Sequence, residues 1–344
     1  MKVGALSSGK NVPSARFRVR QYIVPLAKEG IEVIELYSKI DKYSPPSEWM
    51  RQLALKDWKR ASRFMFQLKK FYKKPLVKKA STFDIVWLER TLVETKLTYE
   101  LNIKKPMVFD LDDAIWLLEG KGFTDKIASR ADHIFAGNSF LADWCKKYNN
   151  NVSVIPTAVD TEKYFPVERK NEKKIIFGWI GTSSNYRFLQ TIFPVIHEIL
   201  ALYPQVEFHV CSELRPDFNS DQFNFIQWNP EMEIDFLQSL DFGLMPLNDD
   251  EWSRGKCSLK MLQYMAMGIP AIVSPYGMNA ELLSQWNSDF GASSLSEWKE
   301  KIIVLIENEK LRTESGITAR KLMVEKYDVK IIASTIASHF KKLI

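Results

Sequence analysis

The chain has 344 residues, of which 46% are hydrophobic, 12% aromatic and 26% charged, a composition typical of folded globular proteins. It excludes a disordered tail, a collagen-like fibre and a small disulfide-stabilised domain, and the length predicts two domains. The net charge of +6 is unevenly distributed, because residues 1–165 hold 29 Lys and Arg against 19 Asp and Glu, or +10, and the remainder carries −4.

Short β-type runs alternate with helical segments along the chain, the pattern of parallel sheets covered by helices on both faces. In the first half we expect strands at 2–7, 31–37, 84–89, 106–111, 133–137 and 152–156. In the second half we expect them at 174–180, 206–211, 223–227, 242–246 and 269–274. Because the series restarts after a polar break, the sequence predicts an α/β protein with two doubly wound, Rossmann-like parallel sheets.

The polar break divides the chain into an N-terminal domain, 1–160, a linker, 161–174, and a second domain, 175–327. The last segment, 328–344, predicts a helix with Asp328 as its N-cap. The apolar face of this helix must dock on one of the domains, and the N-terminal domain is one candidate.

The segment 47–79 lacks strand signals and predicts one or two basic helices. Residues 56–79 contain ten Lys and Arg against one acid, Asp57, with aromatic residues between them. One interpretation is a solvated helix whose aromatics pack on the sheet, and another is an interfacial helix attracted to an anionic membrane surface. Nucleic acid is disfavoured, because no base-reading or stacking motif accompanies the charge.

The cysteines Cys145, Cys211 and Cys257 have no disulfide-like or zinc-like spacing, which favours a reducing compartment. No apolar run approaches ~18 residues, and the N-terminal run is too short for a signal peptide. We therefore expect a cytoplasmic protein, with peripheral association at the inner face of the membrane through the basic segment as an option.

In doubly wound sheets, ligands bind outside the carboxyl ends of the strands, so the loops there hold the candidate site residues. In the loop after the first strand, Ser8 and Gly9 let the backbone approach a ligand, and Arg16 and Arg18 supply charge. An ordinary turn capped by Ser14, with solvated arginines, is the alternative.

Three carboxylates, Asp110, Asp112 and Asp113, lie within four residues at the end of the fourth strand. Such a cluster suits cation binding, hydrogen bonds from sugar hydroxyls or acid-base chemistry, and these are the candidate catalytic residues. Asp110 and Asp112 also fit the Asp-x-Asp pattern by which some sugar transferases hold a divalent metal. Helix N-capping by Asp112 or Asp113 is the alternative.

The second domain offers two anion-binding loops. The first contains Gly181, Thr182, Ser183 and Asn185, a strand end followed by hydroxyls and an amide at a helix start. A simple helix N-cap explains the same residues.

In the second loop, Arg254, Lys256 and Lys260 gather at the start of a helix that Ser258 is expected to cap and Gly268 to end. A diphosphate would fit these three cations.

The run Lys260 to Ser274, KMLQYMAMGIPAIVS, with the loop 275–281 after it, resembles the donor-site helix and strand of glycosyltransferase family 4, which has the GT-B architecture. The runs 154–165, 13–18 and 110–113 resemble other segments of that family. The resemblance covers essentially the whole chain. It implies two Rossmann-like domains facing a cleft.

The resemblance also implies the reaction: transfer of a sugar from a nucleotide-diphosphate sugar to a glycan or lipid-linked acceptor, with retention of configuration. Neither a metal nor a cofactor besides the donor is implied. Gln263 and Asn279 join the donor-side residues, and the loop from Ser8 to Arg18 becomes the acceptor side.

The sequence departs from the family at three places. Members commonly carry two glutamates seven residues apart, where this chain has Gly255 and Gln263. Where many have a histidine after the fourth strand, this chain has Asp112 or Asp113. The basic residue expected after the first strand of the second domain is missing until Arg187.

Three other functions remain as alternatives. A metal-dependent GT-A transferase would use Asp110 and Asp112 but leaves the second series of strands without a role. A non-catalytic protein that binds sugar nucleotides or a membrane surface would keep the fold and lack turnover. A sugar-nucleotide epimerase is less favoured, because the opening arginine loop suits an acceptor.

Overall fold

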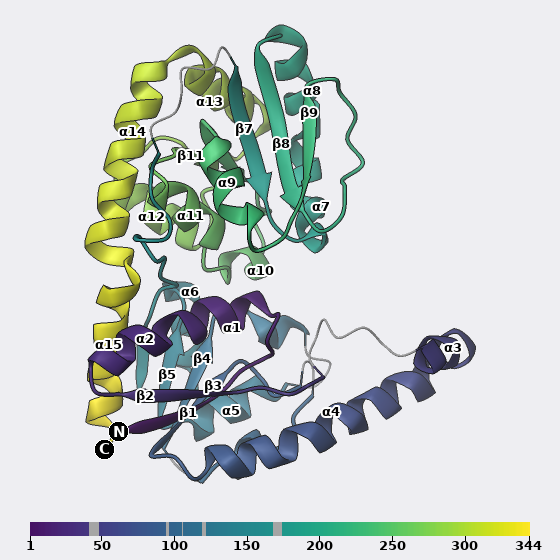
Figure 1. The fold of residues 1–344 in the computed structure, drawn as a ribbon, viewed down its shortest axis with the longest axis vertical. Coiled ribbons are helices and arrows are strands. Elements are labelled where there is room, and N and C mark those ends of the chain that lie inside the picture. Colours follow the sequence, from purple (N-terminus) through teal and green to yellow (C-terminus); the bar gives the residue numbers. More distant parts are fainter. Residues whose placement is uncertain (41–47, 94–95, 105, 119–121, 168–173) are drawn as a thin grey trace. The chain divides into compact units, whose positions relative to one another are not determined.

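The computed structural model describes residues 1–40, 48–93, 96–104, 106–118, 122–167 and 174–344. They form two compact units: unit 1 contains Met1–Ala158 and Val329–Ile344, and unit 2 contains Val159–Asp328 (Figure 1). Of the linker expected at 161–174, the part up to residue 167 belongs to unit 2, and residues 168–173 lie outside the described residues.

Unit 1 is built on a six-stranded parallel sheet of order β2-β1-β3-β4-β5-β6. Its strands are β1 (Lys2–Leu6), β2 (Glu32–Leu36), β3 (Ile85–Glu89), β4 (Met107–Leu111), β5 (His133–Ala136) and β6 (Val152–Val154). The six strands predicted for the first half are thus confirmed. Because β2 and β3 flank β1 on opposite sides, the sheet reverses its winding between β1 and β3.

The helices of unit 1 lie between these strands and at the C-terminus. They are α1 (Pro13–Arg18), α2 (Ile23–Lys28), α3 (Glu48–Lys56), α4 (Trp58–Ala80), α5 (Thr124–Arg130), α6 (Ser139–Cys145) and α15 (Val329–Lys342), with single 3₁₀ turns at Arg20–Tyr22, Glu100–Asn102 and Ile115–Leu118. The basic segment therefore forms two helices, α3 and α4, as predicted.

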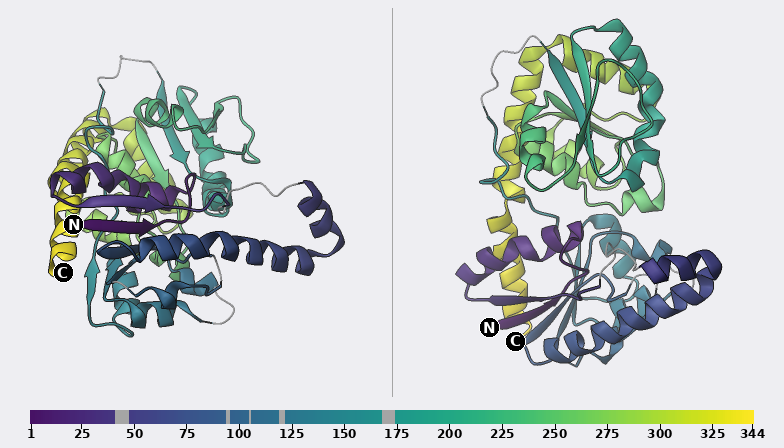
Figure 2. Two further views of the ribbon diagram at one scale, coloured as in Figure 1. Left: turned by 60° about the horizontal axis from the view of Figure 1, so that its bottom comes forward. Right: turned by 45° about the vertical axis from the view of Figure 1, so that its right-hand side comes forward.

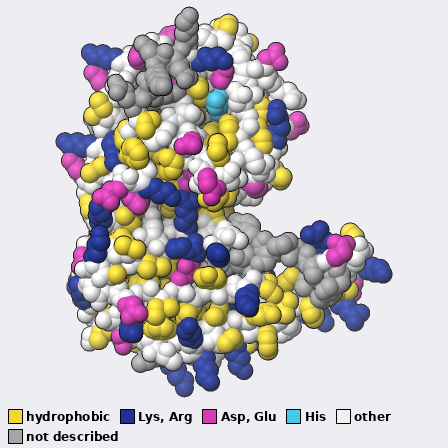
Figure 3. All heavy atoms as spheres, in the orientation of Figure 1, with side chains coloured by type: hydrophobic (Ala, Val, Ile, Leu, Met, Phe, Trp, Pro, Cys, Tyr) yellow, Lys and Arg dark blue, Asp and Glu magenta, His cyan; other side chains and the backbone are white. Residues whose placement is uncertain are grey.

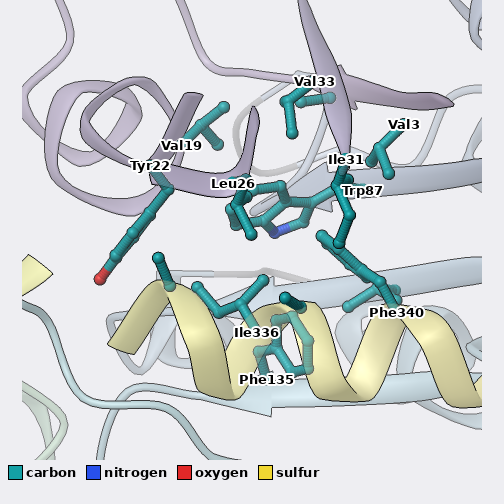
Figure 4. Close-up of a cluster of buried hydrophobic side chains, with 14 of the residues drawn as sticks. Val3, Val19, Tyr22, Leu26, Ile31, Val33, Trp87, Phe135, Ile336 and Phe340 are labelled. Atoms are coloured by element: carbon teal, nitrogen blue, oxygen red, sulfur yellow. The ribbon is translucent and has the colours of Figure 1, made fainter. Parts of the chain in front are cut away.

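The C-terminal helix α15 completes the core of unit 1. Its apolar residues Ile332, Ile336 and Phe340 belong to the same buried cluster as Trp87 (Figure 4). The ring centre of Phe340 lies 5.4 Å from that of Trp87 in an edge-on arrangement. Just before α15, the Asp328 carboxylate accepts hydrogen bonds from the amide and hydroxyl of Thr161.

Unit 2 is built on a five-stranded parallel sheet of order β11-β10-β7-β8-β9. Its strands are β7 (Ile175–Ile180), β8 (Val206–Ser212), β9 (Phe223–Gln227), β10 (Phe242–Met245) and β11 (Ala271–Val273). All five strands predicted for the second half are confirmed. The sheet reverses its winding between β7 and β10.

The helices of unit 2 cover both faces of this sheet (Figure 2). They are α7 (Tyr186–Leu189), α8 (Phe193–Leu202), α9 (Met232–Ser239), α10 (Glu251–Arg254), α11 (Leu259–Ala266), α12 (Met278–Trp286), α13 (Leu295–Glu307) and α14 (Glu309–Leu322), with short turns at Ser183–Asn185 and Gln190–Ile192 and a π-helical turn at Met323–Tyr327. None of the helices among the described residues has the length and apolar character needed to span a bilayer.

The predicted capping of α11 is wrong at its start and right at its end. Ser258 has a left-handed φ of 52°, and its hydroxyl donates to Asn279 Oδ1 at 2.6 Å and makes no cap hydrogen bond. The helix stops before Gly268, whose φ of +69° suits the residue after a helix end. A Cβ at Gly268 would lie 3.1 Å from Pro166.

The docking of α15 brings two histidines together. The ring of His339 on α15 lies 4.7 Å from that of His133 on β5, and His133 Nε2 contacts Ser153 Oγ at 3.0 Å. Burial, together with the charges of His339 and Lys342, lowers the pKa of His133 to about 4. Burial also lowers the pKa of His339.

These pKa values predict that unit 1 loses stability between pH 6.5 and about 4. In this window the unfolded chain takes up protons at both histidines while the folded chain resists them, so the free energy of unfolding falls as the pH falls. Urea unfolding at several pH values should show a flatter pH dependence for His133→Gln/His339→Gln than for the wild type. His197→Gln in unit 2 is the control, and parallel curves for wild type and double variant would contradict the prediction.

Candidate functional site

The carboxyl ends of β7 and β10 form the winding switch point of unit 2, where doubly wound sheets bind ligands. Lys260, on the first turn of α11, reaches this point. Its Nζ lies 5.2 Å from the centre of the Trp179 ring, and a Cβ at Gly181 would lie 2.6 Å from Lys260 Cε. The glycine therefore lets the lysine side chain cross directly over the end of β7, which brings two predicted site residues into contact.

The other two predicted cations have different surroundings. Lys256 Nζ lies 5.2 Å from the centre of the Trp252 ring and 5.8 Å from that of Phe188. Arg254 is half-exposed and donates from Nε and Nη2 to Asp249 Oδ1 at 3.0 and 2.7 Å.

The loop after β11 approaches the C-terminal end of α10, at Arg254. Gly277 has a φ of +54°, and a Cβ there would lie 2.5 Å from the carbonyl oxygen of Arg254. The close approach of these two backbones therefore requires glycine at position 277.

The loop after β7 binds a carboxylate of the chain itself. The Ser183 amide donates to both Glu213 oxygens at 2.9 and 3.0 Å, and its hydroxyl donates at 2.6 Å. Thr182 Oγ1 accepts from Asn185 Nδ2 at 2.8 Å. Burial raises the pKa of Glu213, but the hydrogen bonds from Ser183 outweigh burial and lower it. Glu213, which the sequence analysis missed, follows β8 at the same edge of the sheet, and that position was the available signal.

Gln263 and Asn279 are buried in the scaffold of unit 2. Gln263 Nε2 donates to Tyr164 Oη at 3.3 Å and to Glu233 Oε1 at 3.4 Å. Asn279 is fully buried, accepts from Ser258 and donates to the carbonyl of Ser274 at 2.9 Å. Both amide groups of these predicted donor-side residues are thus engaged inside the protein.

The switch point of unit 1 lies between β1 and β3, and Glu89 occupies it. Its Oε2 accepts from the Ser8 amide at 2.8 Å and from the Ser8 hydroxyl at 2.6 Å. Its Oε1 has no hydrogen-bond partner among the described residues and lies 3.6 Å from Arg90 Nε. Burial raises the pKa of Glu89, although the charge of Arg90 opposes the change.

Arg90 joins two of the three predicted catalytic aspartates. Its Nε donates to Asp112 Oδ1 and its Nη2 to Asp113 Oδ2, each at 2.5 Å. Arg90 has an unusual φ of 56°, and its side chain is 21% exposed, so the group borders solvent. Burial raises the pKa of Asp112, but the charge and hydrogen bond of Arg90 outweigh burial and lower it. Sequence reasoning missed Glu89 and Arg90, although they directly end a predicted strand.

Asp110, the third predicted catalytic residue, is buried beneath this group with Arg18. Arg18 Nε donates to Asp110 Oδ1 at 2.8 Å, Trp87 Nε1 donates to Oδ2 at 3.1 Å, and both charged side chains are 1% exposed. Burial raises the pKa of Asp110 to about 6 against the opposing effect of Arg18. Arg18, expected on the acceptor side, also donates to the carbonyl of Ile155 at 2.8 Å. Their burial favours a structural role for both residues.

The rest of the opening loop is nearer the surface. The Arg16 guanidinium lies 4.7 Å from the centre of the Phe17 ring. The carbonyl of Gly9 accepts from Arg20 Nη2 at 3.3 Å, and Arg20 also donates to both oxygens of Glu35. Ser8 is therefore held by Glu89, and Gly9 by Arg20, which Glu35 binds in turn.

In the parts of the chain that the structure describes, no group of three or more His, Cys, Asp or Glu residues is arranged to hold a metal ion. Asp110 and Asp112, the proposed metal ligands of the GT-A alternative, each contact an arginine. The second parallel sheet contradicts that alternative, which requires a single sheet domain.

Comparisons place this fold among known structures. No protein-family model matches the chain, and a search of curated proteins finds no match. One similar solved structure is described as "Trehalose-6-phosphate from E. coli bound with UDP-2-fluoro glucose". Its TM-score is 0.70 at 10% sequence identity, and the match covers 100% of both chains. Another is WaaG, a glycosyltransferase involved in lipopolysaccharide biosynthesis (0.62, 11%, 98% of this chain and 99% of that one).

A third similar structure is a putative UDP-N-acetylglucosamine 2-epimerase from Listeria monocytogenes (TM-score 0.63, 12% identity, 99% of this chain and 97% of that one). Two parallel α/β sheets, together with these matches over the full chain, define the GT-B fold.

The buried ion pair predicts a large loss of stability for Asp110→Ala. Removing the carboxylate leaves the Arg18 charge buried without it, which costs about 3–5 kcal/mol. Asp143→Ala, at an exposed pair with Lys146, should change stability by less than ~0.5 kcal/mol. Urea unfolding measures both. Arg18→Met/Asp110→Ala should lose less than the two single variants combined, and equal midpoints for Asp110→Ala and Asp143→Ala would contradict the prediction.

Proposed function

We propose that this chain is a nucleotide-sugar-dependent glycosyltransferase of family 4 that transfers a sugar, with retention of configuration, to a glycan or lipid-linked acceptor. The observation that carries the proposal is the position of Lys260 over Gly181 at the switch point of unit 2. The similarity to a structure with a bound UDP-sugar analogue supports it.

In the proposed donor site, the cations meet the charge that develops in the reaction. Negative charge builds on the leaving diphosphate while the sugar becomes oxocarbenium-like. Lys260, Lys256 and Arg254 would stabilise that charge, and each fixed donor group of this kind contributes on the order of 3 kcal/mol in a dry site. Thr182, Ser183 and Asn185 would line the same phosphates. Gln263 and Asn279 would support the donor site through their buried hydrogen bonds within unit 2.

In the proposed acceptor site, Ser8, Gly9 and Arg16 receive the acceptor beside the carboxylates of Asp112 and Asp113. These two aspartates border solvent with Arg90, so they would hydrogen-bond sugar hydroxyls. The buried ion pair of Asp110 and Arg18 would support the positions of these two aspartates. We include in the proposal a cytoplasmic location, peripheral to the inner face of a membrane.

Lys260→Ala is expected to lower turnover about 100-fold or more, because it removes a cation aimed at the leaving group. Hydrolysis and transfer with a panel of nucleotide sugars measure this. Thermal shift with nucleoside diphosphates provides a separate binding readout, since a ligand at a hundredfold excess over its Kd stabilises the wild type by roughly 2.7 kcal/mol. Arg254→Ala should behave like Lys260→Ala.

The matched control is Lys310→Ala, at an exposed lysine of unit 2 that pairs with Glu314. It should retain turnover and ligand-induced stabilisation. Wild-type turnover in both Lys260→Ala and Arg254→Ala would contradict the assignment of a diphosphate to this helix.

Full activity is expected in the presence of a chelator, because the proposed site meets the diphosphate with side-chain cations. The measurement is transfer or donor hydrolysis with and without EDTA. Loss of activity with EDTA, restored by Mn²⁺, would contradict a metal-independent reaction.

Two other functions give distinct results in the same assays. A non-catalytic sugar-nucleotide-binding protein would show thermal stabilisation without turnover. The similarity to the Listeria epimerase motivates a second candidate, an epimerase, which would change the configuration of the donor sugar without releasing the nucleotide diphosphate. Product analysis separates the three.

A further inference from the structure

The helices α3 and α4 form a hairpin that the sheet of unit 1 covers only in part. Toward the C-terminal end of α4, Lys73, Val77 and Ala80 are buried. The N-terminal part of α4 and all of α3 extend away from the sheet (Figures 1 and 2). At the corner between the helices, Leu55 is 82% exposed and Trp58 is 72% exposed.

One exposed stripe of α4 combines aromatic rings with positive charge. Its members follow one another at alternating spacings of four and three residues, so they lie on the same face of the helix. They are Arg60, Phe64, Gln67, Phe71, Lys74 and Lys78. Phe64 is 44% exposed and Phe71 is 72% exposed, and the stripe contains no acid. The aromatics of this stripe therefore do not pack on the sheet.

Two shallow hollows, of about 650 and 610 Å³, run along this stripe and share Phe64. Their apolar lining comes from Leu53, Phe64, Leu68 and Phe71. Their cationic lining comes from Lys56, Arg60, Lys70 and Lys74. In Figure 3, Lys and Arg side chains gather with hydrophobic side chains over α4.

The charge decides among possible occupants. Residues 48–80 contain eleven Lys and Arg against two acids, so a second copy of the hairpin would be repelled. An anionic bilayer attracts such a surface, and its headgroup boundary accepts aromatic rings between cations. Apolar hollows bordered by cations match the two parts of an anionic lipid, an acyl chain and a phosphate.

We propose that the α3–α4 hairpin docks on an anionic lipid bilayer, with Phe64 and Phe71 entering the headgroup boundary and Arg60, Lys74 and Lys78 binding lipid phosphates. This surface would present a lipid-linked acceptor to unit 1, and in that respect, as in the peripheral location, the inference rests on the proposed function. Docking itself requires no sugar transfer.

Co-sedimentation of the full chain with vesicles tests the proposal. We expect binding to phosphatidylcholine vesicles that contain phosphatidylglycerol, weak binding to phosphatidylcholine alone, and loss of binding at high salt. Arg60→Gln/Lys74→Gln/Lys78→Gln should weaken binding roughly 100-fold, because each cation near an anionic surface contributes a several-fold increase in affinity. Phe64→Gln/Phe71→Gln should also weaken it, even at low salt.

Matched controls come from exposed residues of unit 2. Lys310→Gln/Lys321→Gln removes charge, and Leu202→Gln/Ile317→Gln removes exposed apolar side chains, and both should bind vesicles like the wild type. Equal binding to both vesicle types, no binding to either, or hairpin variants that bind like wild type would overturn the proposal. So would binding of the hairpin to an acidic protein but not to vesicles.

Donor hydrolysis without vesicles separates this proposal from the proposed function. The hairpin variants should hydrolyse nucleotide sugars at the wild-type rate, which also shows that they fold. A wild type that binds anionic vesicles without hydrolysing or transferring any donor would overturn the proposed function and leave the docking surface standing.

Discussion

The parallel direction of all eleven described strands is the constraint on which both candidate sites depend. It brings the loop after every strand to one edge of its sheet, whatever the distance along the chain. Ser8 thus binds Glu89, 81 residues away, and Lys260 lies over Gly181. Both candidate sites lie at the point where the winding of the sheet reverses.

The strands could be predicted because their signal is local. Short apolar runs between polar turns indicate strands, and ten of the eleven predicted ranges contain the observed strand in full, while β8 extends one residue past its range. The helices of the basic segment and the C-terminal end of α11 could be predicted for the same reason. Composition and spacing were also sufficient to indicate that the chain restarts its fold after residue 160.

The partners of individual side chains could not be predicted, because they come from distant residues. The three aspartates at the end of β4 look equivalent in the sequence, but Asp110 contacts Arg18 in the core whereas Asp112 contacts Arg90 near the surface. Ser258 has the sequence of a helix cap and binds Asn279, 21 residues later. A residue type at a strand end therefore indicated a candidate site but did not identify which side chain is accessible.

The position of α15 has a consequence for synthesis of the protein. Phe340 and Ile336 complete the core around Trp87, but the ribosome makes them after all of unit 2. Unit 2 is contiguous in sequence, so it can fold while the chain is still being extended. Unit 1 must wait for α15 to be made, so its nascent N-terminal part keeps apolar surface of the sheet uncovered until that helix docks.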